Sequence, residues 1–354
     1  MYALSDYNYP LPVELIAQKP AERRDQANLL VMDRRTEVLS HHRFNALDNL
    51  LNCGDVLVVN NTAVIPGRLL GKKDSGGKVE VLICGFNGYG KPGVIREDRV
   101  YECLVKAAKP PKAGSSFYFD EGLTAQVIER RNGTYLIRFC TEADFEALLD
   151  RIGKVPLPPY IKRRPELAPP CDDRAAYQTV YASEKGAIAA PTAGLHFTSE
   201  LLERLKIKGI DVVAITLHVG YGTFLPVRAH DIRSHQMHSE TYSIPGQTAD
   251  KINSARSAGH RVIAVGTTCV RTLEYASASG GNVRAGNGRC DLFIYPGYRF
   301  KAVDGMITNF HLPQSTLLML VSAFAGREKV LQAYQEAIKR KYRFYSYGDA
   351  MLIV

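Results

Sequence analysis

The side chains in this sequence best suited to acid–base chemistry are histidines, because an imidazole titrates near neutral pH. His196 follows Thr192-Ala193-Gly194 in a segment too irregular for a helix interior, so we expect it on a loop that faces a cleft. His218 follows an apolar strand and runs into Gly220, where a glycine lets the backbone approach a ligand closely. Both are candidates for proton transfer. A histidine that only ties a turn together by hydrogen bonds would also fit either position.

Two further segments combine polar residues with the expected start of a helix. Gly266-Thr267-Thr268 joins an apolar strand to a helix, and the unpaired N–H groups of a helix start favour an anion such as a carboxylate or a phosphate. Asn309 and His311 come just before a helix that Gln314 or Ser315 can begin. We expect both side chains to be fixed and exposed, which makes His311 a third acid–base candidate. Plain helix capping explains either segment as well.

A third group resembles a set of metal ligands. His235, His238 and Glu240 have the short spacing and the side-chain types that suit zinc or iron. The same residues also suit polar contacts to a substrate, with Glu240 facing a cation. The cysteines are odd in number and scattered, with no Cys-x-x-Cys pair, which argues against a cysteine zinc site and a disulfide framework.

The balance of charge favours a polyanionic partner. The chain has 45 basic and 36 acidic side chains, a formal charge of +9, although a merely basic protein would fit about as well. Near the C-terminus, cations alternate with aromatic rings, as on a surface that joins phosphate contacts to base stacking: Lys339, Arg340, Lys341, Tyr342, Arg343, Phe344 and Tyr345. Lys162 and Arg163 begin a second basic run. Either run is equally typical of a solvated surface.

Strands and helices that alternate from about residue 198 onward would position these residues. The predicted strands are 211–217, 262–265 and 292–295, and the predicted helices begin at Thr198, Thr248, Gly266, Gln314 and Glu328. The strands are apolar over nearly their whole length, which is typical of strands buried on both faces. This pattern predicts an α/β layer domain.

Residues 67–156 have a different pattern, with short strands separated by turns. Strands are expected at 78–84, 101–105, 124–128 and 135–139, with a tight turn at Asn132-Gly133. A small antiparallel β-barrel would remove the exposed edges of so many short strands. The strand at 55–60 is again of α/β type, so we predict a barrel domain at 67–156 inserted into a discontinuous α/β domain of residues 1–66 and 157–354, with 156–159 as the return linker.

No apolar run is long enough to cross a membrane, and the first residues lack the basic flank and apolar stretch of a secretory signal. We expect a cytoplasmic protein without membrane contact.

Many segments, in order along the chain, resemble the S-adenosylmethionine:tRNA ribosyltransferase-isomerase family, which forms epoxyqueuosine in tRNA. They include Pro191-Thr192-Ala193-Gly194-Leu195-His196-Phe197-Thr198 and Thr308-Asn309-Phe310-His311-Leu312-Pro313, and the others are 15–20, 22–25, 177–182, 217–220, 222–224, 235–240, 266–268, 271–274, 294–298 and 343–350. So many long matches are far more specific than one short motif. Asn61 and Ala63 depart from the family, which usually carries Asp and Arg there, and residues 101–112 match poorly.

The resemblance implies a reaction and a set of site residues. The ribosyl group of S-adenosylmethionine, a co-substrate, is built onto 7-aminomethyl-7-deazaguanine at the wobble position of tRNA, with release of adenine and methionine and without a metal. A base and an acid are needed, and His196, His218 and His311 are assigned to these roles. The expected contacts to substrate or S-adenosylmethionine are Thr192, Gly220, Thr223, His235, His238, Glu240, Gly266, Thr267, Thr268, Arg271 and Asn309. The expected contacts to tRNA are Lys162, Arg163, Lys339, Arg340, Lys341 and Arg343, and we expect a monomer.

Three other classes of protein fit less well. A tRNA-guanine transglycosylase would need a zinc site and repeated βα units, and the sequence has no cysteine cluster for that zinc. A non-catalytic RNA-binding protein would leave the loops rich in His, Asn and Gly unexplained. A nicotinamide dehydrogenase would need Gly-x-Gly-x-x-Gly after an early strand, and that motif is missing.

Overall fold

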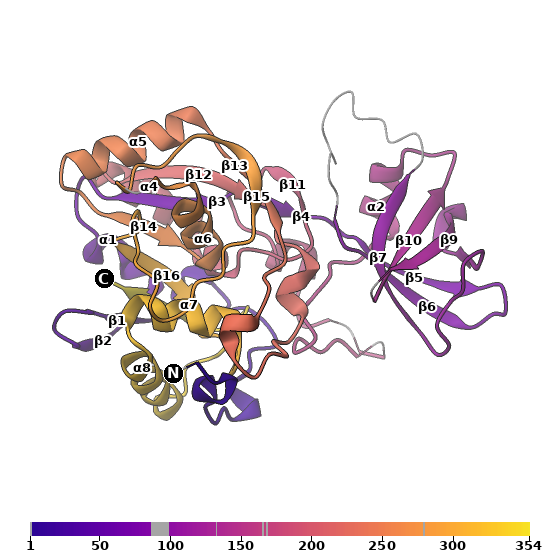
Figure 1. The fold of residues 1–354 in the computed structure, drawn as a ribbon, viewed down its shortest axis with the longest axis horizontal. Helices are drawn as coiled ribbons and strands as arrows, with labels where there is room; N and C mark the ends of the chain where they lie inside the picture. Colours follow the sequence, from indigo (N-terminus) through magenta and orange to yellow (C-terminus); the bar gives the residue numbers. More distant parts are fainter. Residues whose placement is uncertain (1, 86–98, 132, 165, 168, 279) are drawn as a thin grey trace.

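The computed structural model describes residues 2–85, 99–131, 133–164, 166–167, 169–278 and 280–354. A large sheet with helices on both faces forms one part of the molecule, and a small barrel stands beside it (Figure 1). The predicted fold class, an α/β layer domain with an inserted small antiparallel β-barrel, is confirmed.

The large sheet has nine strands in the described chain, and its centre is parallel. In spatial order they are β15 (Gly286–Cys290), β13 (Glu240–Ile244), β12 (Asp211–Leu217), β3 (Val56–Asn60), β14 (Val262–Val265), β16 (Gly305–Asn309), β17 (Ala350–Ile353), β1 (Asn28–Met32) and β2 (Leu39–Arg43). Strands β12, β3, β14 and β16 are parallel neighbours. Their carboxyl ends therefore meet along one edge of the sheet, which we call the carboxyl edge.

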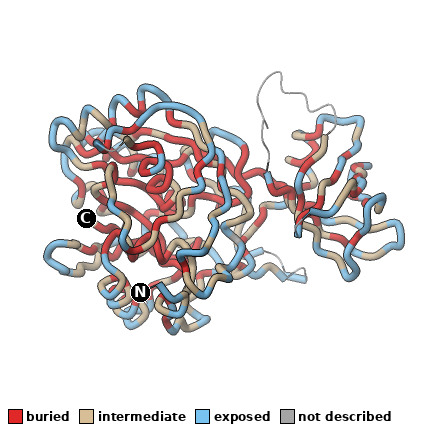
Figure 2. Tube along the Cα trace, viewed as in Figure 1, coloured by how far each residue is buried: buried red, intermediate tan, exposed pale blue. Residues whose placement is uncertain are grey.

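The sheet is buried on both faces, and β3 shows why. Val56 and Val58 belong to the apolar core of one face, whereas Leu57 and Val59 belong to that of the other, because successive side chains of a strand point to opposite sides. The helices over the first face are α5 (Gly246–Ser257), α6 (Thr267–Ala276), α7 (Thr316–Ala325) and α8 (Arg327–Lys339), and those over the second are α1 (Leu47–Leu50) and α4 (Ser199–Ile207). Figure 2 shows the buried chain between these layers.

Capping side chains in the sequence predict the starts of α4 and α7 correctly, but not that of α5. The Thr198 hydroxyl accepts a hydrogen bond from the Leu201 N–H at 3.2 Å and begins α4, as predicted. The Ser315 hydroxyl does the same for α7. The predicted start of α5 at Thr248 is wrong, because this helix begins at Gly246 and the Thr248 hydroxyl donates to the Ala214 carbonyl of β12 at 2.9 Å instead.

The predicted strand at 292–295 is also wrong. These residues form neither helix nor strand, and the Leu292 carbonyl accepts a hydrogen bond from Arg271 Nε at 3.0 Å. The strand of this region is β15, a few residues earlier, which pairs with β13. An apolar run alone does not distinguish a strand from an irregular segment whose backbone is hydrogen-bonded by a side chain, here that of Arg271.

Among its described residues, the barrel contains six strands that all pair antiparallel: β5 (Arg68–Lys73), β6 (Lys78–Ile83), β7 (Val100–Ala107), β8 (Ser116–Tyr118), β9 (Thr124–Arg131) and β10 (Thr134–Cys140). Helix α2 (Phe145–Ile152) packs on its aromatic core. Of the predicted turn, Asn132 lies outside the described residues, and Gly133 has the positive φ of 95° that favours glycine.

Strand β4 (Thr62–Val64) leads from β3 to the barrel. The chain that leaves the barrel passes beside this entry point, because Lys154 and Arg68, the first residue of β5, exchange backbone hydrogen bonds. The exact domain boundaries at 66/67 and 156/157 stay a prediction. None of the helices in the described ranges has the length and apolar character that a bilayer-spanning helix needs.

Candidate active site at the carboxyl edge of the sheet

Four parallel strands end in polar or glycine-bearing segments at the carboxyl edge. His218 follows β12, Asn60 ends β3, Gly266 follows β14, and Asn309 ends β16. In open α/β sheets, ligands bind outside the carboxyl ends of the strands. The parallel order of these strands therefore brings most of the predicted site residues to one edge.

His196 lies in a buried cluster with two other predicted site residues. The Asn309 amide donates to His196 Nε2 at 3.2 Å, and the Thr192 hydroxyl donates to Asn309 Oδ1 at 3.2 Å. The Asn309 amide also donates to the Tyr345 carbonyl at 3.1 Å, which fixes its orientation. His196 belongs to the short 3-10 helix η6 (Thr192–His196) and is only 5% exposed, so the expectation of an open loop is wrong.

Burial determines the charge state of this histidine. It lowers the pKa of His196 to about 4, which Asp349 partly opposes and Arg343 reinforces. Because Nε2 accepts a hydrogen bond from an amide, the ring proton is on Nδ1. The imidazole is therefore neutral at pH 7, a state in which it can accept a proton but cannot serve as a cationic acid.

A second network joins His218 to the start of α6. The Thr62 hydroxyl is hydrogen-bonded to His218 Nδ1 at 2.8 Å, and the Thr62 N–H donates to Asn60 Oδ1 at 3.1 Å. The Asn60 amide in turn donates to the Thr268 hydroxyl at 3.3 Å. His218 is half-buried, so its ring is held by this network while part of it stays accessible.

The start of α6 lies against η6, which connects the two networks. Gly266 precedes the helix with a φ of 86°, and a Cβ placed there would lie 3.7 Å from the Ala193 side chain. Thr267 is buried beside it. The first turn of a helix offers unpaired N–H groups and a partial positive charge, which suits a carboxylate or a phosphate.

Glu240 and Arg271 form a buried ion pair next to these residues. Arg271 donates to Glu240 at 2.5 Å, and the side chains are 7% and 8% exposed. The other carboxylate oxygen of Glu240 accepts from the Gly220 N–H at 2.9 Å. The ion pair thus fixes the loop after β12 against α6. A contact of Glu240 with a cationic substrate stays a prediction.

Other predicted contacts lie apart from these networks. Thr223 and His238 are exposed, and the ring of His238 lies 5.2 Å from that of Tyr221. His235 is half-buried against Phe293, and burial lowers its pKa. Within the described ranges, no group of three His, Cys, Asp or Glu side chains is close enough to hold a metal ion.

The expectation that Asn309 and His311 are exposed is wrong, since they are only 2% and 8% exposed. His311 Nε2 is hydrogen-bonded to the Thr308 hydroxyl at 2.7 Å, and the backbone N–H of His311 donates to the Tyr334 hydroxyl at 2.9 Å. Burial lowers the pKa of His311 to about 3. Its contact with Tyr334 on α8 ties this histidine to the core.

The basic segment near the C-terminus divides into two kinds of residue. Lys339, Arg340 and Lys341 are exposed and Arg343 is half-buried, whereas the neighbouring rings of Tyr342, Phe344 and Tyr345 are at most 6% exposed. The interpretation of these rings as a base-stacking surface is therefore wrong, because they pack in the core. Lys162 is exposed, but Arg163 is bound to Asp173 at 2.8 Å.

A cavity of about 460 Å³ opens beside the edge strand β2. Its lining is mostly basic and polar: Asn28, His41, His42, Arg43, Arg340 and Tyr342. Asn28 of β1 pairs with Arg43 of β2. Ala350 of β17 pairs on one side with Asn309, the last residue of β16, and on the other with Leu29, the neighbour of Asn28. Asn28 and Arg43 therefore lie at the carboxyl edge. Glu336 partly offsets the charge, since its carboxylate lies 2.5 Å from Arg340 and 3.8 Å from His41. We call this feature the basic cavity.

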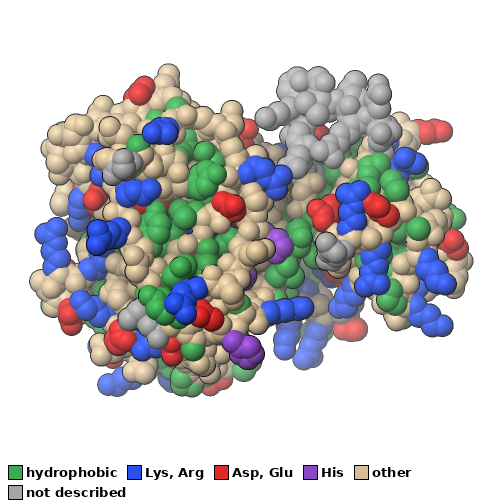
Figure 3. Space-filling view, in the orientation of Figure 1, with side chains coloured by type: hydrophobic (Ala, Val, Ile, Leu, Met, Phe, Trp, Pro, Cys, Tyr) green, Lys and Arg blue, Asp and Glu red, His purple; other side chains and the backbone are tan. Residues whose placement is uncertain are grey.

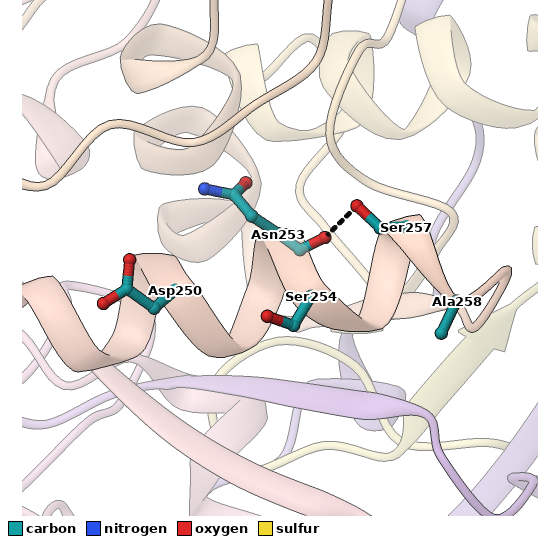
Figure 4. Close-up of a pocket in the computed structure, with 5 residues that line it drawn as sticks. All are labelled: Asp250, Asn253, Ser254, Ser257 and Ala258. Carbon is teal, nitrogen blue, oxygen red and sulfur yellow. Dashed lines mark hydrogen bonds between the residues drawn. The ribbon is translucent and has the colours of Figure 1, made fainter.

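A second hollow, of about 640 Å³, is shallow and lies along α5 (Figure 4). Its lining comes from this one helix and its end: Asp250, Asn253, Ser254, Ser257 and Ala258. It contains none of the predicted site residues.

Sequence reasoning missed two residues that organise the site, Asn60 and Thr62. Asn60 is fully buried, and its amide also donates to the Leu217 carbonyl at 2.9 Å. A polar residue that ends an apolar strand was the available signal. Asn61, a departure from the family, accepts from the Thr216 hydroxyl at 2.7 Å and donates to Ser183 at 3.0 Å. The second departure, Ala63, is buried in β4.

The whole chain, not only the site, matches known proteins. Residues 4–353 match the family described as queuosine biosynthesis protein. The chain belongs to this family. It is 51% identical over 352 residues to the S-adenosylmethionine:tRNA ribosyltransferase-isomerase of Trichlorobacter lovleyi and 52% identical over 354 residues to that of Acetivibrio thermocellus, covering 99% of each chain in both comparisons.

The family match extends to a crystal structure. The S-adenosylmethionine tRNA ribosyltransferase of Thermotoga maritima is 37% identical and superposes with a TM-score of 0.55, over 99% of this chain and 100% of that one. The family resemblance predicted from the sequence is therefore confirmed.

Proposed function

We propose that this chain transfers and isomerises the ribosyl group of S-adenosylmethionine onto 7-aminomethyl-7-deazaguanine at the tRNA wobble position, forming epoxyqueuosine and releasing adenine and methionine. One observation carries the proposal, the similarity over the full length at 51% identity to a protein named for this activity. The protein is a transferase of queuosine biosynthesis, and S-adenosylmethionine is its co-substrate.

The geometry suggests how the residues divide the work. The reaction needs a base for a proton beside the sulfonium and an acid for the departing adenine. The neutral, buried His196 suits the base, and the amide of Asn309 holds its ring in one orientation. His218, half-buried at the same edge, suits the acid. The start of α6 suits the methionine carboxylate, and Gly266, Thr267 and Thr268 would be its contacts.

The tRNA would approach the carboxyl edge from the side of the basic cavity. A phosphodiester is the ligand that a cavity with Arg43 and Arg340 favours, and Lys339 and Lys341 extend the positive surface beside it. Figure 3 shows Lys and Arg side chains over both parts of one face, with Asp and Glu among them. We assign residues 67–156 to a barrel domain and the rest to the α/β domain. We also propose that the enzyme acts as a monomer in the cytoplasm, where its tRNA substrate is found.

A single incubation tests this function. Purified protein is mixed with tRNA that carries 7-aminomethyl-7-deazaguanine and with S-adenosylmethionine labelled in the ribose. Adenine release together with label in the tRNA is the expected result, and tRNA with guanine at the wobble position is the control. Label found only as S-adenosylhomocysteine, with none in the tRNA, would contradict the proposal.

A further inference from the structure

Two buried hydroxyl groups at the candidate site have no hydrogen-bond partner among the described residues, those of Thr179 and Tyr181. Both side chains meet Gly194, the middle residue of η6. A Cβ placed at Gly194 would collide with the Tyr181 hydroxyl and would lie 2.9 Å from the Thr179 methyl group. Thr192 and His196 lie two residues to either side of Gly194 in the same short helix.

This arrangement is unusual for a purely structural role. A buried hydroxyl without a partner costs free energy, and most buried polar groups in native proteins are paired. In the described chain, three hydroxyl groups are buried without a partner, and the third, that of Ser322, lies in α7. Two of the three therefore belong to side chains that meet at one glycine of the candidate site.

Tyr181 is held against η6 and the residue that follows it, and its hydroxyl lies beside Gly194. The ring packs edge-to-face on Phe197, with 6.2 Å between the ring centroids. Burial raises the pKa of Tyr181 well above its usual value, and the second cause is Cys269 in the first turns of α6. The phenol is therefore neutral, and it lies against η6, the element that bears His196.

We propose that Tyr181, with Thr179 beside it, hydrogen-bonds an uncharged oxygen or nitrogen of the nucleoside part of S-adenosylmethionine. A neutral hydroxyl matches a ribose hydroxyl or a ring nitrogen, whereas the start of α6 matches the charged carboxylate at the other end of the molecule. This inference rests on the proposed function and adds two substrate-positioning residues to it. Gly194 is then required because any larger residue would displace the Tyr181 hydroxyl.

The substitutions Tyr181→Phe and Thr179→Val remove the hydroxyls and keep the shapes. We expect the KM for S-adenosylmethionine to rise about tenfold in Tyr181→Phe, as for one lost hydrogen bond, with a smaller change in kcat. We expect the melting temperature of the ligand-free protein to stay the same or to rise, because an unpartnered buried hydroxyl is lost. The increase in melting temperature that S-adenosylhomocysteine causes should shrink, which gives a readout that does not depend on turnover.

Two control variants separate substrate binding from structure. Ser322→Ala removes the third unpartnered hydroxyl, which lies in α7 and does not meet Gly194, and should leave the KM unchanged. Tyr334→Phe removes a hydroxyl that accepts from His311 and should lower the melting temperature. The inference is overturned if Tyr181→Phe and Thr179→Val both keep the wild-type KM and the wild-type increase in melting temperature with S-adenosylhomocysteine. The hydroxyls are then satisfied by ordered water. Failure of the wild type to release adenine would refute the proposed function. The comparison of the melting-temperature increases caused by S-adenosylhomocysteine would still decide this inference.

Discussion

The cluster around His196 and the C-terminal segment of residues 339–343 show two ways of placing functional groups. In the cluster, His196 and Asn309 are 5% and 2% exposed and are joined by a hydrogen bond of 3.2 Å. In the segment, Lys339, Arg340 and Lys341 extend into solvent. The first region is suited to chemistry that needs one exact geometry, whereas the second is suited to attraction between charges, which needs little geometry. Substitutions should therefore change the rate in the first region and the affinity for RNA in the second.

The largest effect is expected for His196→Ala. Loss of a general base typically slows a reaction about a hundredfold to ten-thousandfold, so single-turnover adenine release with saturating tRNA and S-adenosylmethionine should fall by that factor. The matched control is His230→Ala, because His230 is exposed and is assigned no contact with a substrate. Its rate should stay within a fewfold of the wild type. A His196→Ala rate equally close to wild type, with an unchanged melting curve, would remove this histidine from the mechanism.

An intermediate effect is expected from pH, because the histidines of the buried region are held neutral. Burial lowers the pKa of His196 to about 4 and that of His311 to about 3, whereas an unfolded histidine titrates near 6.5. Between these values only the unfolded state binds the proton, so stability is complete above about pH 6.5 and is lost as the pH falls towards 4. Each histidine should reduce the free energy of unfolding by about 2 kcal/mol between pH 7 and pH 5.

Urea denaturation at the two pH values measures this difference. The variant His311→Gln should lose about 2 kcal/mol of the pH dependence, while Ser322→Ala, which removes no titratable group, should keep all of it. Equal pH dependence in the wild type and His311→Gln would show that His311 is not the buried neutral group described above.

The smallest effect is expected in the C-terminal segment. The double substitution of Lys339 and Lys341 by Gln should lower the slope of log affinity for tRNA against log salt by about two units, about one for each phosphate contact. Fluorescence anisotropy with labelled tRNA at several salt concentrations gives the slope. The control is the double substitution of Arg35 and Lys206 by Gln, which should leave the slope unchanged. These two residues are exposed cations of the β1–β2 turn and of α4. If both double variants behave alike, the segment is only a solvated surface.

Local sequence determined much of this protein. The alternation of apolar strands and capped helices predicted the α/β layers, and strands at 211–217 and 262–265 were placed at their observed bounds, because burial on both faces leaves a continuous apolar run. The short strands separated by turns in residues 67–156 predicted the barrel. The motifs, in order along the chain, identified the family. The signals were weaker where a short apolar run had two interpretations, as at residues 292–295.

Only the tertiary structure decided which of the candidate residues meet. Thr192 and Asn309 are separated by 117 positions in the chain, and their hydrogen bond exists because η6 packs on β16. The same packing buries His196 and lowers its pKa, which no local pattern reports. The aromatic rings of residues 342–345 turned inward because an apolar ring gains more from the core than from solvent, while the cations beside them stayed outside. Residue types and spacing predict possible chemistry, but burial and partners depend on contacts between distant segments.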